Sequence, residues 1–229
     1  NPLIKNVSID NVLKIFSSFY YTDYHPLQLL SYMFDYALWK SNPVGYRITN
    51  IVLHAINGIM VFVITRKILA ITSCIPVHDR NAVATAASYI FLSHPTAVES
   101  VIWISERKNV LSMAFMLMSF YAYITYREME LKKFFYLSIL LFIFALLSKA
   151  SAVVLPIFIV LLDYSLYPVD NKHSKTVLLE KAPFFILSLM SGILTVNAQA
   201  YAGAVKDYPD GTLLSQLSVT IRALTFYVS

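Results

Sequence analysis

The stretch that decides the fold of this chain runs from Gly45 to Leu69 and reads GYRITNIVLHAINGIMVFVITRKIL. A helix that crosses a lipid bilayer needs about 20 mainly apolar residues, because each residue adds about 1.5 Å to its length. This stretch meets that length. It therefore predicts a membrane-spanning α-helix.

The composition of the whole chain agrees with this prediction. Hydrophobic residues occupy 58% of the 229 positions, charged residues occupy 14%, and the mean hydropathy is +0.63. A soluble domain carries roughly 25% charged residues. The chain is too apolar for a soluble domain, and we expect an integral membrane protein.

Further apolar segments follow along the chain, and some reach the length of a span while others approach it. They run from Ala82 to Leu92, Val110 to Tyr126, Phe134 to Leu147, Val153 to Tyr167 and Pro183 to Ala200. A last amphipathic stretch, from Leu213 to Val228, predicts the start of another span. Residues 44–229 therefore predict an all-α, polytopic bundle of about six transmembrane helices plus an incomplete terminal helix.

Residues 1–43 predict a loop outside the bundle that contains a helix lying in the membrane interface. Apolar residues recur there at the i, i+3, i+7 and i+11 positions of one helix face, namely Leu27, Leu30, Phe34 and Leu38. Gln28 and Asp35 fall away from this apolar stripe, which is the pattern of an amphipathic helix.

Basic residues in the short loops predict the orientation. Nine of them share one side of the predicted bundle: Arg66, Lys67, Arg80, Arg127, Lys132, Lys133, Lys172, Lys175 and Lys181. The positive-inside rule makes that side cytoplasmic, although the opposite side carries about eight basic residues of its own. The opposite, periplasmic or lumenal side then holds the loop from His94 to Lys108 and the connection around Lys149.

Several kinds of chemistry are excluded. The single cysteine, Cys74, allows no internal disulfide and no cysteine-based zinc site. The sequence contains no Walker motif and no GxGxxG, HExxH or GxSxG motif, so we expect no metal and no cofactor. The basic residues stand in short clusters between apolar segments, which indicates the lipid bilayer as a partner and not nucleic acid.

The loop from His94 to Asn109 carries five ionisable groups between two predicted spans. We expect Glu99 to face inward or toward an aqueous pocket, with Arg107, Lys108 or Arg47 as its counter-ion. An ion pair that only joins two helices is the simpler interpretation.

Three basic residues of the same side, Arg107, Lys108 and Lys149, are candidates for binding a lipid-linked phosphate. The alternative for Lys149 is a side chain that reaches out to the membrane interface.

A second set of polar residues predicts a substrate pocket on the same side: Asp23, His25, Arg47 and His94. Arg47, Asn50 and His54 repeat at helical spacing on one face of the first span, and polar residues on such a face point into a bundle. Hydrogen bonding between helices explains Asn50, His54 and Asn57 more simply, and a solvated turn explains Asp23 and His25.

The sequence resembles a known family. Its blocks YHPL (24–27), NPVGYRITNIVLH (42–54), the segment from His94-Pro95 to Arg107-Lys108, LSK (147–149) and LLDY (161–164) resemble signature blocks of the transmembrane and tetratricopeptide-repeat (TMTC-type) glycosyltransferases, in the same order. The resemblance is closer to bacterial members. The order of the blocks makes the resemblance more specific than any single block.

This resemblance implies a membrane enzyme with a GT-C fold. Such an enzyme takes a sugar from a polyprenyl-phosphate carrier and passes it to an acceptor. Animal relatives are protein O-mannosyltransferases, which implies a protein hydroxyl as acceptor and mannose as sugar. Within that scheme Glu99 is the candidate catalytic residue, and Arg107, Lys108 and Lys149 bind the donor phosphate. The location is then a bacterial inner membrane or the endoplasmic reticulum, with the active face periplasmic or lumenal.

Two departures from the family pattern bear on activity. The family's acidic catalytic motif follows its first span, which would lie just before Asn1, so we expect a fragment that lacks this span and the downstream repeats. Ala150 stands where animal relatives tend to have an acidic residue. A non-catalytic membrane scaffold subunit of a larger complex is therefore the competing hypothesis, and a transporter or channel is a third, disfavoured by the absence of an inverted repeat.

Overall fold

The computed structural model describes residues 2–17, 24–167, 174–203, 218–219 and 222. All regular structure in this part of the chain is helical. The elements in chain order are η1 (Pro2–Ile4), α1 (Ile9–Ser17), α2 (Pro26–Trp39), α3 (Pro43–Thr72), α4 (Val77–Ser93), α5 (Pro95–Ile102), η2 (Ile104–Glu106), α6 (Arg107–Met129), α7 (Lys132–Ser148), η3 (Ala150–Val154), α8 (Leu155–Leu166) and α9 (Ser174–Tyr201). The predicted all-α fold is confirmed over the described ranges.

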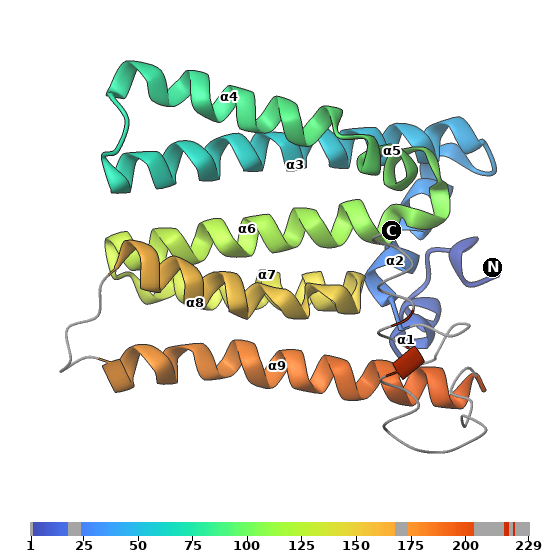
Figure 1. Cartoon of the computed structure of the whole chain (residues 1–229). Helices are drawn as coiled ribbons and strands as arrows, with labels where there is room; N and C mark the ends of the chain where they lie inside the picture. The colour runs from blue at the N-terminus through green and yellow to red at the C-terminus, as the bar shows by residue number, and fades with distance from the viewer. Residues whose placement is uncertain (1, 18–23, 168–173, 204–217, 220–221, 223–229) are drawn as a thin grey trace.

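The long helices lie side by side with their axes roughly parallel (Figure 1). The pair α3 and α4 forms one edge of the bundle, α6, α7 and α8 form its centre, and α9 forms the other edge. The short helices α1, α2 and α5 gather at one end. We call this the polar end, because the candidate residues of the loop between α4 and α6 lie there.

The predicted apolar segments coincide with helices, with differences at the boundaries. The segment from Ala82 to Leu92 lengthens to α4, because the helix begins at Val77. The segment predicted from Pro183 to Ala200 also lengthens, since α9 begins nine residues earlier at Ser174 and contains Pro183 in its interior. The segment from Leu213 to Val228 lies outside the described residues except for 218–219 and 222.

Two helices among the described residues are long and apolar enough to cross a membrane, Pro43–Thr72 and Leu179–Tyr201. Only 22% and 11% of their most apolar windows are buried inside the bundle. A core helix of a soluble protein hides its apolar surface, whereas these two expose most of theirs. The other predicted spans form helices, and their crossing of a membrane stays a prediction.

The apolar core lies between α6, α7, α8 and α9. Its fully buried aromatic residues are Tyr123, Phe142 and Phe184. Ser119 Oγ and Ser138 Oγ donate to each other's carbonyl oxygens at 2.7 and 2.8 Å. Because serine is small, these contacts let α6 and α7 approach closely. The hairpin of α6 and α7 is thus the scaffold on which the polar end is built.

The start of α3 follows from its sequence. Asn42 Oδ1 accepts a hydrogen bond from the Val44 backbone N–H at 3.1 Å, and Pro43 occupies the first turn, where a missing N–H costs least. The apolar stripe of α2 faces outward, with Phe34 and Leu38 strongly exposed, while Asp35 is buried. A helix is therefore present where the amphipathic helix was predicted, and its polar residue Asp35 points into the bundle. Its location in the membrane interface stays a prediction.

Candidate functional site

Arg107 joins three helices at the polar end. It begins α6 and is completely buried. Its Nη1 atom forms an ion pair with Asp35 of α2, its Nε donates to Asn50 Oδ1 of α3 at 2.8 Å, and its Nη2 donates to the Tyr46 carbonyl oxygen at 2.7 Å. The guanidinium also lies over the Tyr32 ring, 4.8 Å from its centroid. Each nitrogen of Arg107 therefore has a partner inside the fold.

Arg107 was one of three residues predicted as the counter-ion of Glu99, and in the structure it pairs with Asp35 instead. Glu99 lies exposed on α5. Sequence reasoning missed Asp35 as a functional partner, although its position off the apolar stripe of α2 was a signal. A carboxylate on the polar face of an amphipathic helix must meet either water or a cation of the bundle.

The turn that precedes α6 is held by side chains of α2 and α3. Gln28 Nε2 donates to the Ser105 carbonyl oxygen at 2.8 Å, and the Tyr32 hydroxyl donates to the Ile104 carbonyl oxygen at 2.5 Å. Burial raises the pKa of Tyr32 above its ordinary value of 10.0, so this hydroxyl keeps its proton at neutral pH.

From α3, Asn50 Nδ2 donates to the carbonyl oxygens of Val101 and Trp103 at 3.2 and 3.3 Å. Asn57 Nδ2 likewise donates to the Val110 carbonyl oxygen of α6 at 3.0 Å. These contacts confirm the helix-to-helix hydrogen bonding predicted for Asn50 and Asn57. They also close the polar end around the start of α6.

A second chain of polar contacts ties the end of α7 to the start of α6. Lys149 Nζ donates to Asn109 Oδ1 at 2.5 Å, and Asn109 Nδ2 donates to Glu106 Oε2 at 2.8 Å and to Ser100 Oγ at 2.9 Å. Lys149, Asn109 and Glu106 are each half-buried. Lys149 therefore remains within reach of solvent, and its polar contact with the described residues is to a neutral amide, that of Asn109.

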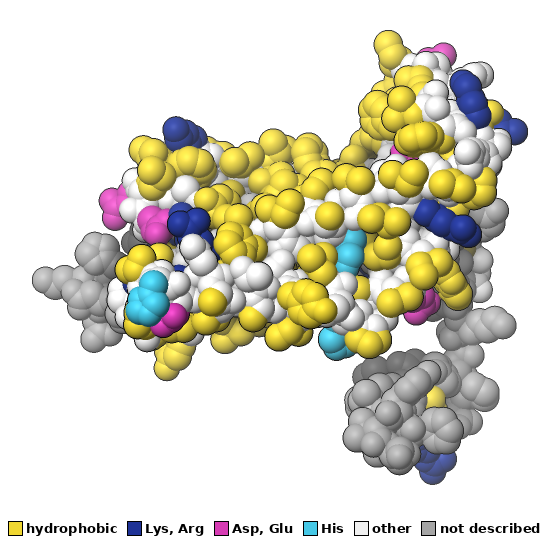
Figure 2. Space-filling model, turned by 90° about the horizontal axis from the view of Figure 1, so that it is seen from above, with side chains coloured by type: hydrophobic (Ala, Val, Ile, Leu, Met, Phe, Trp, Pro, Cys, Tyr) yellow, Lys and Arg dark blue, Asp and Glu magenta, His cyan; other side chains and the backbone are white. Residues whose placement is uncertain are grey.

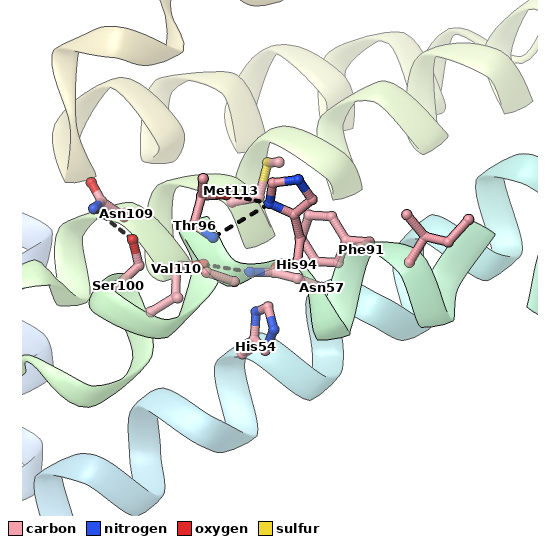
Figure 3. A pocket seen from close by; sticks show the side chains of 11 residues that line it. His54, Asn57, Phe91, His94, Thr96, Ser100, Asn109, Val110 and Met113 are labelled. Atoms are coloured by element: carbon pink, nitrogen blue, oxygen red, sulfur yellow. Dashed lines mark hydrogen bonds between the residues drawn. The ribbon is translucent and has the colours of Figure 1, made fainter. Parts of the chain in front are cut away.

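A pocket of about 320 Å³ lies beside these polar contacts, between α3, α4, α5 and α6 (Figure 3). Its apolar wall contains Ile90, Phe91, Val110 and Met113. Its polar residues are His54, Asn57, His94, Thr96, Ser100 and Asn109. His94, a predicted pocket residue, therefore lines a pocket, and Asn109 belongs both to the pocket wall and to the contact with Lys149.

The hydrogen bonds of the two histidines define their donor and acceptor atoms. His54 Nε2 lies 3.2 Å from the Leu92 carbonyl oxygen, which only accepts, so Nε2 carries the proton. His94 Nδ1 accepts from the Thr96 backbone N–H at 3.3 Å, so the neutral His94 ring carries its proton on Nε2. His54 Nδ1 is then an acceptor and His94 Nε2 a donor.

The other predicted site residues are placed separately. Lys108 is half-buried in the first turn of α6, His25 is half-buried directly before α2, and Arg47 is exposed on α3. Asp23 lies outside the described residues. The structure therefore brings together His94, Lys149 and the start of α6, whereas Arg107 takes a place inside the fold and Glu99 and Arg47 lie on its surface.

A charged cluster at the opposite end of the bundle was not predicted. Asp163 of α8 is buried and accepts from Tyr123 at 2.7 Å, with Lys181 Nζ 2.6 Å away and Arg127 Nε 3.3 Å away. Sequence reasoning treated Arg127 and Lys181 as loop charges. They instead join α6, α8 and α9, because a buried carboxylate requires cationic or hydrogen-bonding partners.

Comparison with curated proteins gives distant matches. The chain is 30% identical over 157 residues to Protein O-mannosyl-transferase Tmtc1 of Drosophila melanogaster, covering 67% of this chain and 17% of that protein. It is 25% identical over 159 residues to Protein O-mannosyl-transferase F38B6.6 of Caenorhabditis elegans, covering 65% and 21%. It is 27% identical over 100 residues to Protein O-mannosyl-transferase TMTC3 of Homo sapiens, covering 44% and 10%.

The chain thus spans between 10% and 21% of the length of these relatives. No family model and no solved structure matches it. The similarities to several protein O-mannosyl-transferases agree with the ordered sequence blocks described above. They assign this chain, as a distant relative, to the TMTC-type family.

Proposed function

We propose that this chain forms part of the membrane domain of a glycosyltransferase. In this proposal the enzyme passes a sugar from a polyprenyl-phosphate-linked donor to a protein hydroxyl on the periplasmic or lumenal face. The relatives that carry the family assignment are named protein O-mannosyl-transferases, which supports glycosyl transfer and suggests mannose as the sugar.

The distribution of apolar surface supports a multi-pass location in the membrane. Figure 2 shows hydrophobic side chains along the middle of the bundle, while charged side chains gather toward its two ends. Large apolar residues are exposed on several helices, for example Ile51 on α3, Leu140 on α7, Phe158 on α8 and Leu189 on α9. Exposing so large an apolar band to water is unfavourable, whereas lipid tails solvate it.

The observation that carries the site assignment is the contact between Lys149 and Asn109 beside the pocket. We place the donor phosphate at Lys149, assisted by Lys108, because an ammonium group stabilises phosphate oxygens as a point charge. Arg107 acts in this proposal as a positioning residue, since its guanidinium is occupied by Asp35, Asn50 and Tyr46. Glu99, exposed on α5, positions the acceptor.

The proposed reaction is an inverting transfer. The acceptor hydroxyl oxygen attacks the anomeric carbon of the sugar, a carboxylate takes the hydroxyl proton, and the bond from that carbon to the phosphate oxygen breaks. Negative charge grows on the departing phosphate, and Lys149 stabilises it there. Preorganised charge of this kind is usually the largest single contribution to such catalysis.

The test is sugar transfer in membranes that contain the full-length protein, with a mannosyl polyprenyl phosphate donor and a serine- and threonine-containing peptide. We expect Lys149→Ala to lower transfer by about 10²-fold or more, the scale for losing one charge-stabilising group. Lys132→Ala, an exposed lysine at the opposite end, is the matched control and should retain wild-type transfer. Equal activity of the two variants would remove Lys149 from the donor site.

One observation favours the alternative of a non-catalytic scaffold subunit. Arg107, the residue best suited to bind a phosphate, is completely buried, and its contacts hold neighbouring helices together. A scaffold would show no transfer in this assay and would instead copurify with a larger membrane complex. Measured transfer that depends on Lys149 would exclude it.

A further inference from the structure

The pocket between α3, α4, α5 and α6 has a character that the proposed phosphate site does not explain. None of its eleven lining residues is lysine, arginine, aspartate or glutamate. A phosphate in such a pocket would lose its hydration without gaining a counter-ion. Desolvation of an unpaired charge costs on the order of several kcal/mol. The occupant that fits is therefore neutral.

The walls of the pocket differ in polarity. Ile90, Phe91, Val110 and Met113 offer apolar surface, while the histidines, Thr96, Ser100 and Asn109 offer hydrogen-bonding groups. A pyranose ring has the same two-sided character, because its C–H bonds form apolar faces and its hydroxyl groups project from the edge. An aromatic side chain such as Phe91 packs well against such a face.

The hydrogen-bonding groups also match hydroxyl groups, which both donate and accept. In the neutral rings His94 Nε2 is a donor and His54 Nδ1 an acceptor. Asn57 is buried, and its Oδ1 accepts no hydrogen bond from the described residues. A buried acceptor without a donor costs about 1–3 kcal/mol, so a hydroxyl that reaches Oδ1 after a small side-chain movement is favoured.

The position of the pocket agrees with this assignment. Asn109 belongs to its wall and accepts from Lys149 at 2.5 Å. A neutral compartment thus adjoins a cationic side chain, across one shared asparagine. The volume of about 320 Å³ falls at the lower end of the usual range for small-molecule sites, about 300–1,000 Å³. This size suits a compact ligand.

We propose that this pocket binds the neutral pyranose ring of a sugar substrate, with His54, Asn57 and His94 as hydrogen-bonding partners and Phe91 as the packing surface. The inference rests on the proposed function, since it divides the donor into a sugar held in the pocket and a phosphate held outside it at Lys149. It also makes a separate claim about binding, which is testable without turnover.

The experiment measures binding of methyl α-mannopyranoside to the full-length protein in lipid nanodiscs by saturation-transfer NMR, without sugar-based detergents. Ala97→Leu fills the pocket and removes no side-chain hydrogen bond, because Ala97 lines the pocket and has only a methyl group. We expect it to abolish the sugar signal. Ala82→Leu, at an exposed position of α4, is the matched control and should bind as the wild type does.

A second variant tests the hydrogen-bonding assignment. Asn57→Leu should weaken binding roughly three- to tenfold, the effect of one lost hydrogen bond. Asn81→Leu, an exposed asparagine of α4, is its control. Inorganic phosphate should not displace the sugar, because the pocket carries no charged side chain.

The outcomes separate the two proposals. Sugar binding that is lost in Ala97→Leu supports the pocket assignment even where no transfer is measured, in which case the proposed function alone fails. Wild-type binding by both Ala97→Leu and Asn57→Leu, or no binding by the wild-type protein, overturns the pocket assignment. Transfer that still depends on Lys149 would then leave the proposed function standing.

Discussion

The guanidinium of Arg107 in α6 lies against the carboxylate of Asp35 in α2, and both side chains are buried. Seventy-two positions separate the two residues in the sequence, and their contact closes the polar end of the bundle. The ion pair explains why α2 lies across the start of α6.

Arg107→Ala should destabilise the protein by about 3–5 kcal/mol, because it leaves Asp35 buried without a counter-ion. The thermal unfolding midpoint in nanodiscs measures this loss. The double variant Asp35→Leu with Arg107→Met should recover most of the stability, since two apolar groups replace a buried pair at little cost. Arg47→Ala, at an exposed arginine, is the control and should change stability by less than about 0.5 kcal/mol. A single variant as stable as this control would show that the pair contributes nothing.

Gly45 should not tolerate a larger side chain. A Cβ atom there would lie 2.1 Å from Trp39 Cγ and 2.6 Å from Trp39 Cβ, which is attached to the backbone of the α2 terminus. Gly45→Ala should therefore cost about 1–3 kcal/mol, the range for overpacking.

Gly192 of α9 provides the matched control for Gly45. Nothing lies within 4 Å of a Cβ built at Gly192. Gly192→Ala should be neutral or stabilising by about 0.5–1 kcal/mol, because alanine favours a helix interior over glycine. Thermal unfolding of the two variants side by side gives the comparison, and equal midpoints would contradict the packing of α2 on α3.

Asp163→Asn should loosen the end of the bundle opposite the polar end. It removes the charge shared by the buried Lys181 and the half-buried Arg127, of which Arg127 keeps Glu180 as a second partner. We expect a loss of about 3–5 kcal/mol and faster proteolysis near α9. Asp79→Asn, whose side chain is 52% exposed, should match the wild type in both measurements. Unchanged proteolysis in Asp163→Asn would argue against the cluster as the link between α8 and α9.

Tyr32 should make the stability of the polar end depend on alkaline pH. Burial raises its pKa in the folded state above the ordinary 10.0, so folding favours the protonated hydroxyl. The contribution of Tyr32 is therefore complete below pH 10 and is lost as the pH rises through the folded-state pKa. The stability difference between wild type and Tyr32→Phe measures it. This difference should shrink above about pH 10, and a constant difference would show that the hydroxyl does not donate to Ile104.

The sequence alone determined which segments form helices and, for some of them, which face contacts the neighbouring helices. Long apolar runs predicted α3, α6, α7 and α9 because a bilayer-length helix needs a fixed number of apolar residues. Helical spacing placed Arg47, Asn50 and His54 on one face of α3. Asn50 and His54 do contact neighbouring helices, whereas Arg47 is exposed. Such predictions depend only on geometry within one helix.

The tertiary structure decided which charges meet. Spacing along the chain cannot show that Arg107 pairs with Asp35, that Lys149 contacts Asn109, or that Asp163 binds Lys181. Each contact joins two helices whose relative height and rotation follow from packing over their whole length. Charges exert little directional preference until packing brings them within a few ångströms of each other, so partner choice is a property of the fold.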